Sequence, residues 1–210
     1  MSAIGPSDHM RDHWWWRPGW HVGRSTYTWH VTFDDQPQLH ELVSAYQTAL
    51  SPLPGLDLIP GRWLHLTMQG IGFTDEVSER EIADITDAAR KHLANLRPVS
   101  LTVGPASVDP EAIMFEVTPT DALSPVRSAI RAAISDVRGA AEVPESEEWT
   151  PHVSLAYSNS DGIAAPYIAA VDSVPSSPVT MTISKADLIE LNRDMRLYQW
   201  TTKAELTFSG

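Results

Sequence analysis

The 210-residue sequence contains no cysteine, which excludes disulfides, thiolate-bound zinc, iron–sulfur clusters and a cysteine nucleophile. No apolar run is long enough to span a bilayer, and the N-terminus lacks the basic-then-apolar pattern of a secretory signal, so we expect a cytoplasmic protein with no membrane partner. Basic residues are few: the sequence has 15 Lys and Arg residues and 27 Asp and Glu residues, which gives a formal net charge of −12. This balance speaks against a broad basic face for duplex DNA or long single strands, but it permits a small phosphorylated ligand in a local pocket.

The first part of the chain is unusual in its aromatic content. Residues 1–13 are polar and marked by Gly and Pro, and we expect them to be frayed. A cluster of tryptophan and arginine follows, formed by Trp14, Trp15, Trp16, Arg17 and Trp20. We therefore expect residues 1–24 to form an N-terminal extension and residues 25–210 to form a single two-lobed domain.

Hydrophobic spacing predicts strands and helices that alternate along the rest of the chain. Period-2 alternation favours strands, and apolar residues at helical spacing favour helices. The expected strands are 27–33, 63–71, 99–103, 113–117, 151–157, 179–191 and 198–208, with a loop at 104–111. The expected helices are 37–50, 75–96, 123–137 and 163–171. This order argues for an α+β or α/β fold with a mixed or antiparallel sheet.

Two of the expected strands carry a histidine followed two residues later by a hydroxyl residue. Residues i and i+2 of a strand share a face, so His65 projects with Thr67, and His152 projects with Ser154. An imidazole can give or take a proton near neutral pH, and a hydroxyl can donate a hydrogen bond to an oxygen. Two such pairs across a cleft could hold one phosphate and serve both sides of an in-line displacement without a metal.

Spacing alone does not select these two pairs. A His-x-Ser/Thr pattern arises about once or twice by chance in a chain of this composition. A third pair, His30 and Thr32, lies on the polar face of the first expected strand. We expect this face to be solvated, with a place beside the cleft as the alternative.

The context of the other two pairs resembles a known family. Trp-Leu-His65-Leu-Thr67-Met followed by Gly70, and Pro-His152-Val-Ser154-Leu-Ala-Tyr157, are similar to the two motif strands of the two-histidine phosphoesterases. That superfamily includes bacterial 2′-5′ RNA ligase-like proteins and 2′,3′-cyclic phosphodiesterases. The resemblance runs from about Tyr27 to Phe208. It implies an α+β fold of two pseudo-symmetric lobes with outer helices and a central cleft, and it implies that His65, Thr67, His152 and Ser154 form the catalytic set, with no metal and no cofactor.

Further residues are candidates for contact with the substrate. Gln69 lies four residues after His65, so alternation places it on the same face of the strand, where it would line the cleft. The family usually has apolar residues at the positions of Met68 and Gln69. We expect the tryptophans to cover the edge of the N-terminal strand or to form a dimer contact, with substrate contact as the alternative, because an aromatic plane beside a guanidinium can stack a base and hold a phosphate. The candidates are Tyr157, Gln69, His30, Arg62, Trp16, Arg17, Arg193 and Tyr198.

The resemblance implies hydrolysis of a 2′,3′-cyclic phosphate on a small nucleotide or an RNA end. Ligation in the 2′-5′ direction would use the same groups, with a 5′-hydroxyl in place of water. The sequence is also compatible with a nucleotide-binding module without turnover and with a phosphodiesterase for a cyclic oligonucleotide. It does not assign the acid and the base to either histidine, and it does not predict the oligomeric state.

Overall fold

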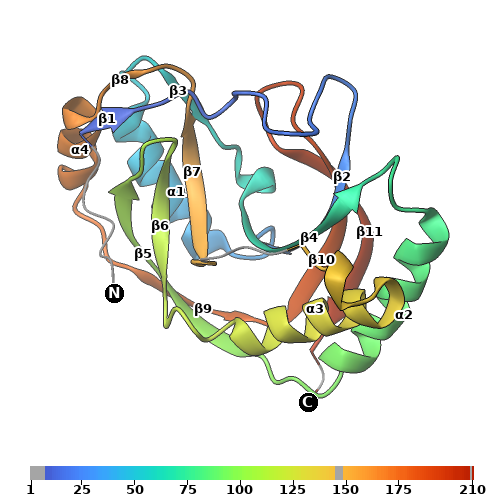
Figure 1. Cartoon of the computed structure of the whole chain (residues 1–210). Helices are drawn as coiled ribbons and strands as arrows, with labels where there is room; N and C mark the ends of the chain where they lie inside the picture. The colour runs from blue at the N-terminus through green and yellow to red at the C-terminus, as the bar shows by residue number, and fades with distance from the viewer. Residues whose placement is uncertain (1–7, 145–148, 209) are drawn as a thin grey trace.

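The computed structural model describes residues 8–144, 149–208 and 210, and its strands form two main antiparallel sheets that face each other (Figure 1). The first sheet has the order β11-β10-β2-β4 and contains β2 (Thr26–Thr32), β4 (His65–Phe73), β10 (Lys185–Asn192) and β11 (Gln199–Thr207). The second sheet has the order β3-β7-β6-β5-β9 and contains β3 (Leu56–Leu58), β5 (Val99–Val108), β6 (Ala112–Thr118), β7 (His152–Ser158) and β9 (Val179–Ile183). A short ribbon pairs β1 (His9–Met10) with β8 (Gly162–Ile163).

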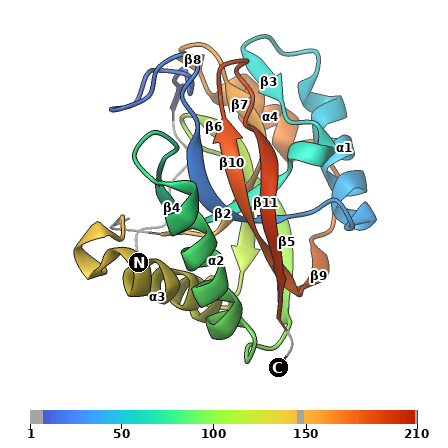
Figure 2. The same cartoon turned by 90° about the vertical axis from the view of Figure 1, so that its right-hand side faces the viewer.

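Each sheet is covered on its outer face by two helices. The helices α2 (Glu79–Leu93) and α3 (Ser124–Arg138) pack together against the first sheet, and α1 (Pro37–Leu50) and α4 (Ala165–Asp172) pack against the second. Figure 2 shows the two helix pairs on different sides of the molecule. Strand β4, at the edge of the first sheet, contacts β7 of the second sheet where the two lobes face each other. The expected two-lobed α+β fold is confirmed, with antiparallel pairing throughout both described sheets.

All four expected helices form within a few residues of their predicted ranges, and the largest difference is at α2, which begins at Glu79 and not at residue 75. Helix α2 begins with a capping box, in which the Ser78 side chain accepts from the Glu81 amide and the Glu81 carboxylate accepts from the Ser78 amide. Helices α1 and α3 each have a proline in the first turn, where a missing N–H costs nothing. The apolar residues of α1 lie at helical spacing and form its buried face, which consists of Leu39, Leu42, Val43, Tyr46 and Leu50.

Two expectations about strands are wrong. The expected loop at 104–111 is mostly strand, because β5 continues through Gly104 and Pro105 with a shift of register between Val103 and Ala106. A proline has no N–H to donate, and a bulge is a place where a sheet tolerates that loss. The expected single strand at 179–191 is two strands in different sheets, separated at Ser184.

The N-terminal segment is also more ordered than expected. Residues 1–7 lie outside the described part of the chain, but within residues 8–13 His9 and Met10 form β1, and the side chains of Met10 and His13 are buried. Met10 is 1% exposed and His13 is 7% exposed. Burial of apolar side chains stabilises an ordered terminus, so the expectation of fraying is wrong for residues 8–13.

Candidate active site

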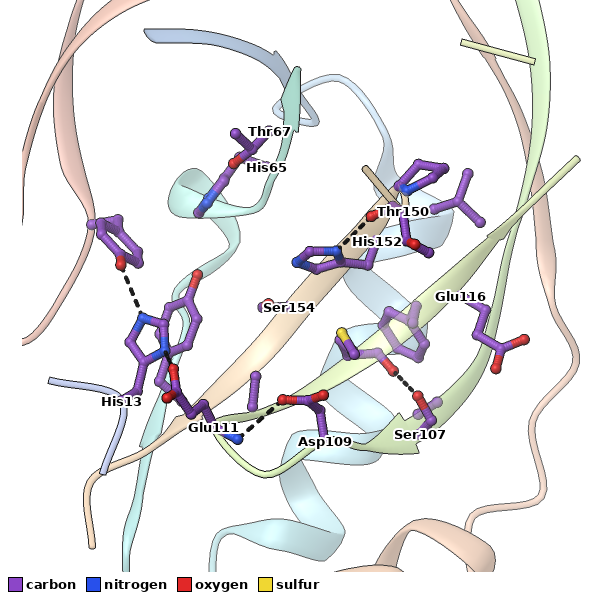
Figure 3. A pocket seen from close by; sticks show the side chains of 18 of the residues that line it. His13, His65, Thr67, Ser107, Asp109, Glu111, Glu116, Thr150, His152 and Ser154 are labelled. Carbon is purple, nitrogen blue, oxygen red and sulfur yellow. Dashed lines mark hydrogen bonds and ion pairs between the residues drawn. The ribbon is translucent and has the colours of Figure 1, made fainter. Parts of the chain in front are cut away.

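A cavity of about 1270 Å³ lies between the two sheets and is lined by residues of both. It contains the four residues that the resemblance marks as a catalytic set. His65 and Thr67 come from β4, and His152 and Ser154 come from β7, so that the two pairs face each other across the cavity (Figure 3).

The two histidines have equivalent positions and equivalent hydrogen bonds. Each is the first residue of its strand. The Nδ1 atom of His65 lies 2.8 Å from the carbonyl oxygen of Trp63, and Nδ1 of His152 lies 2.9 Å from that of Thr150. Because a carbonyl oxygen only accepts, Nδ1 of each ring carries the proton. Each neutral imidazole therefore keeps Nε2 unprotonated, as an acceptor for a proton from a ligand.

The two hydroxyl residues stand beside these rings. Thr67 is exposed to the cavity, and its Oγ1 lies 3.3 Å from Nε2 of His30. Ser154 is buried at 6% exposure and shares a hydrogen bond with Tyr157. Each strand thus places an imidazole and a hydroxyl on one wall, as the alternation predicts.

A bulge in each strand then changes which of the later side chains face the cavity. In β4, His30 pairs with Thr67 but the preceding Trp29 pairs with Gln69, so β4 has one additional residue there. The next residue of β4 that lines the cavity after Thr67 is therefore Gly70. Gln69 turns away and donates to the carbonyl oxygen of Pro144 at 2.8 Å. The prediction that Gln69 lines the cleft is therefore wrong, because one inserted residue reverses every later side chain.

The bulge in β7 has the opposite consequence for its motif. The register shifts between Ile113 and Met114 of the partner strand, with Ser154 paired to Met114 and Tyr157 paired to Ala112. Simple alternation would put Tyr157 on the face opposite to Ser154, but the bulge returns it to the cavity. Gly70 and Tyr157 thus occupy equivalent positions in the two lobes, and the two walls of the cavity differ there.

His30 is buried, not solvated. It is 1% exposed, and its ring stacks on His65 with centroids 4.4 Å apart and planes inclined by 7°. Thr32, the other residue of this pair, is 6% exposed and donates to the carboxylate of Asp187. The expectation of a solvated face is wrong because His30 lies against His65 and Trp200, and the alternative of a place beside the cleft holds for His30, which lines the cavity.

Burial keeps both stacked rings neutral. It is the main cause that lowers the pKa of His65 to about 4, assisted by the nearby His152 and opposed by the hydrogen bond to Trp63. Burial, followed by the proximity of His65, also holds the pKa of His30 well below its usual range. Since a buried charge without a partner is costly, both imidazoles are unprotonated at neutral pH.

One end of the cavity is rich in rings and cations. His13 stacks on Tyr157 with centroids 4.1 Å apart, and its Nε2 lies 2.9 Å from the hydroxyl of Tyr198. Arg17 and Arg193 also line this end. The sequence reasoning missed His13 because it lies in a polar segment that was expected to be frayed, and only the adjacent tryptophan cluster pointed to packing there.

Two other candidates lie outside the cavity lining. Arg62 is exposed, with its guanidinium carbon 5.1 Å from the ring centre of Trp63. Trp16 is 51% exposed and is not among the lining residues. A different tryptophan, Trp149, does line the cavity and donates from Nε1 to the carbonyl oxygen of Thr67 at 2.9 Å.

Metal-binding clusters and membrane-spanning helices are both absent from the described residues. These residues contain no group of three or more His, Asp or Glu side chains placed to hold a metal ion. Among the same residues, no helix has both the length and the apolar character that crossing a membrane requires.

Comparisons with known proteins agree on one fold. A family model described as the 2′-5′ RNA ligase superfamily matches residues 33–195. The crystal structure of TT0787 of Thermus thermophilus has a TM-score of 0.68 at 16% identity, covering 88% of this chain and 98% of that chain. The structure of Escherichia coli LigT complexed with 3′-AMP has a TM-score of 0.65 at 13% identity, and the match covers 89% of this chain and 99% of that chain. LigT complexed with NADP+ has a TM-score of 0.64 at 12% identity, with the same coverage. The comparison with curated proteins finds no match.

Proposed function

This chain belongs to the 2′-5′ RNA ligase superfamily, and we propose that it hydrolyses a 2′,3′-cyclic phosphate on a small nucleotide or an RNA end without a metal ion. One observation carries the proposal. His65 and His152 each use Nδ1 on a backbone carbonyl, and each holds Nε2 free at one shared cavity beside a hydroxyl. This is the arrangement that a reaction with one proton taken and one proton given requires.

In the proposed mechanism the cyclic phosphate lies between the two motif pairs. The hydroxyls of Thr67 and Ser154 donate to its non-bridging oxygens. A water oxygen attacks phosphorus, and the bond from phosphorus to one ribose oxygen breaks. One histidine takes the proton of the water, and the other gives a proton to the departing ribose oxygen. A 5′-hydroxyl in place of water would give ligation with the same groups.

The surroundings of the two histidines favour His65 as the base. Its ring is 8% exposed, stacked on His30 and neutral at pH 7. His152 is exposed to the cavity and accessible to solvent protons. We therefore assign proton abstraction to His65 and proton donation to His152.

Size and charge support a nucleotide-sized substrate. Small-molecule sites usually enclose about 300–1000 Å³, and the cavity of about 1270 Å³ is large enough for a nucleotide with an additional group. The net charge of −12 opposes the docking of a long polyanion. The similarly folded LigT was crystallised with 3′-AMP, a nucleotide of this size.

Turnover of the four nucleoside 2′,3′-cyclic monophosphates, with EDTA present, tests the proposal. We expect release of a 2′- or 3′-monophosphate at a rate that EDTA does not change, because the two proton transfers need only imidazoles. The position of the phosphate in the product identifies the oxygen that leaves. Binding of all four without turnover would instead favour the nucleotide-binding module.

The assignment of His65 as the base predicts an unusual pH profile. Because burial lowers the pKa of His65 to about 4, the ring is deprotonated and active as a base above that pH, and kcat/KM falls as the pH drops through about 4. An ordinary histidine base would lose activity near pH 6.5. The measurement is kcat/KM from pH 3.5 to 9 with enzyme shown to be folded at each pH, and an acid limb above pH 6 would contradict this role.

A further inference from the structure

The N-terminal segment builds one end of the cavity. The amide of Arg11 donates to the carbonyl oxygen of Pro110 at 2.6 Å, and the amide of His13 donates to that of Ser158 at 2.9 Å. The indole of Trp14 donates to the carboxylate of Asp57 at 2.8 Å. This segment precedes residue 33, where the match to the family model begins, so its own contribution to the cavity lies outside the matched region.

Arg193 is a buried cation at this end with no carboxylate in ion-pair contact among the described residues. It is 3% exposed, and Nη2 donates to the carbonyl oxygens of His13 at 3.2 Å and Trp15 at 3.4 Å. Its guanidinium carbon lies 5.3–5.7 Å from three aromatic ring centres, those of Trp14, Trp20 and Tyr198. In the described part of the chain, Arg193 forms no ion pair with a carboxylate, although the charge of Glu111 acts on it at longer range, and its Nη1 has no hydrogen-bond partner. A buried charge in this state is costly unless a ligand compensates it.

Arg17 adds a second guanidinium beside it. Its side chain is 38% exposed, and Nη2 donates to the carboxylate of Glu111 at 3.0 Å, whereas Nε has no partner among the described residues. Glu111 also accepts from the indole of Trp15 at 3.1 Å. Burial is the main cause that lowers the pKa of His13 to about 3, so His13 adds no charge at neutral pH. The charge of the Glu111 carboxylate therefore acts on two guanidinium groups, of which only Arg17 pairs with it directly, in a protein whose net charge is −12.

This cationic end adjoins the two motif pairs. The ring of Tyr198 lies 6.0 Å from the ring of His65 and 5.7 Å from the guanidinium carbon of Arg193. The guanidinium is thus one aromatic ring away from the imidazole. The 5′ carbon of a ribose projects from the side of the sugar opposite to its 2′ and 3′ oxygens, so a ribose can place one phosphate at the histidines and a second at the arginines.

We propose that Arg17 and Arg193 form a second anion subsite, which takes the 5′-phosphate of the ribose whose 2′,3′-cyclic phosphate reacts. The inference rests on the proposed function for the identity of the first phosphate. It specifies a substrate with a phosphate on both sides of the sugar, supplied either by a 5′-phosphorylated nucleotide or by an oligonucleotide end.

A calorimetric comparison of two product-like ligands tests the subsite without requiring turnover. The ligands are 3′-AMP and adenosine 3′,5′-bisphosphate, which differ only in the 5′-phosphate. We expect the wild-type protein to bind the bisphosphate about tenfold or more tightly than 3′-AMP, as charge-assisted hydrogen bonds allow. Arg17→Gln and Arg193→Lys should reduce this ratio toward 1, and Arg80→Gln, which alters an arginine side chain with 92% exposure on α2, should preserve it.

The ratio is internally controlled, because both ligands are measured on the same preparation. Arg193 is buried, so its variant could fail to fold, but Arg17 is partly exposed and keeps the test decisive. A wild-type ratio near 1, or a ratio that survives both substitutions, would overturn the subsite. Since this readout is binding, a protein that discriminates the two ligands but hydrolyses no cyclic phosphate would refute the proposed function alone.

A kinetic arm identifies the source of the second phosphate. The substrates are adenosine 2′,3′-cyclic phosphate, its 5′-phosphorylated form and a diadenylate ending in a 2′,3′-cyclic phosphate. A gain in kcat/KM for the 5′-phosphorylated mononucleotide alone assigns the subsite to a terminal phosphate. A gain for both assigns it to any 5′-phosphate, the internucleotide one included, and a gain for neither overturns the inference even when the unmodified substrate is hydrolysed.

Discussion

Replacement of His65 or His152 by alanine is expected to lower kcat for a 2′,3′-cyclic phosphate by a factor of about 10²–10⁴, the usual contribution of a positioned acid or base. Each variant removes the only imidazole on its wall that keeps Nε2 free beside a motif hydroxyl among the described residues. His152 is exposed, so alanine there leaves the core intact. His65 stacks on His30, so His65→Gln is a second variant that fills more of the space. The measurement is kcat under saturating substrate, with circular dichroism as the check on folding.

His92→Ala is the matched control for these variants. His92 lies in α2 and pairs with Asp136 on the outer face at 2.8 Å. Its loss removes an exposed ion pair, which is worth little, and should leave kcat within about twofold of the wild type. An effect below about tenfold for a folded His65 or His152 variant would remove that residue from proton transfer.

Replacement of the motif hydroxyls is expected to have the second largest effect. Thr67→Val and Ser154→Ala should each lower kcat by about 10²–10³, which is the cost of removing one donor to a developing negative charge. Valine has nearly the shape of threonine, so Thr67→Val changes the donor and little else. The loss should appear in kcat more than in KM, because negative charge on the phosphate oxygens grows in the transition state.

Thr67→Ser provides the control for the hydroxyl itself. It keeps the oxygen that lies 3.3 Å from Nε2 of His30 and removes only a methyl group. Activity within about tenfold of the wild type is expected for this variant. If Thr67→Val retained the activity of Thr67→Ser, the hydroxyl would have no part in the reaction. The role of Thr67 would then be structural, as a β-branched residue that favours a strand.

The parts of the fold that local signals predict are those that depend on nearby residues. Helix α2 is predicted by an acidic first turn and an apolar stripe within one stretch of chain, and its capping box completes the same signal. The division between β9 and β10 has no such local mark. Whether Ser184 continues a strand or ends it depends on which of two sheets each half joins, and that is a contact between distant residues.

The same distinction applies to the candidate site. Alternation along a strand predicts that His65 and Thr67 share a face, because it depends only on neighbouring residues. It fails for Gln69, since the bulge in β4 arises from pairing with β2. It would also have placed Tyr157 away from the cavity, where the bulge in β7 returns it.

Burial of polar residues could not be predicted from their own strand. His30 occupies an alternating polar position of the kind that usually faces water, and the structure buries it under His65 and Trp200. His13 reaches the cavity because a distant N-terminal segment is held there by the hydrogen bond from the His13 amide to Ser158 and by the one from Arg193 to the His13 carbonyl oxygen. Such contacts join residues far apart in the sequence.

The most direct test of the two-histidine mechanism is kcat for a nucleoside 2′,3′-cyclic monophosphate in the wild type, the two single alanine variants and the His65→Ala/His152→Ala double variant. Residues that act as one unit are not additive, so the double variant should be about as slow as the slower single variant. A folded double variant that keeps kcat within about tenfold of the wild type would contradict the mechanism, because turnover would then proceed without either imidazole.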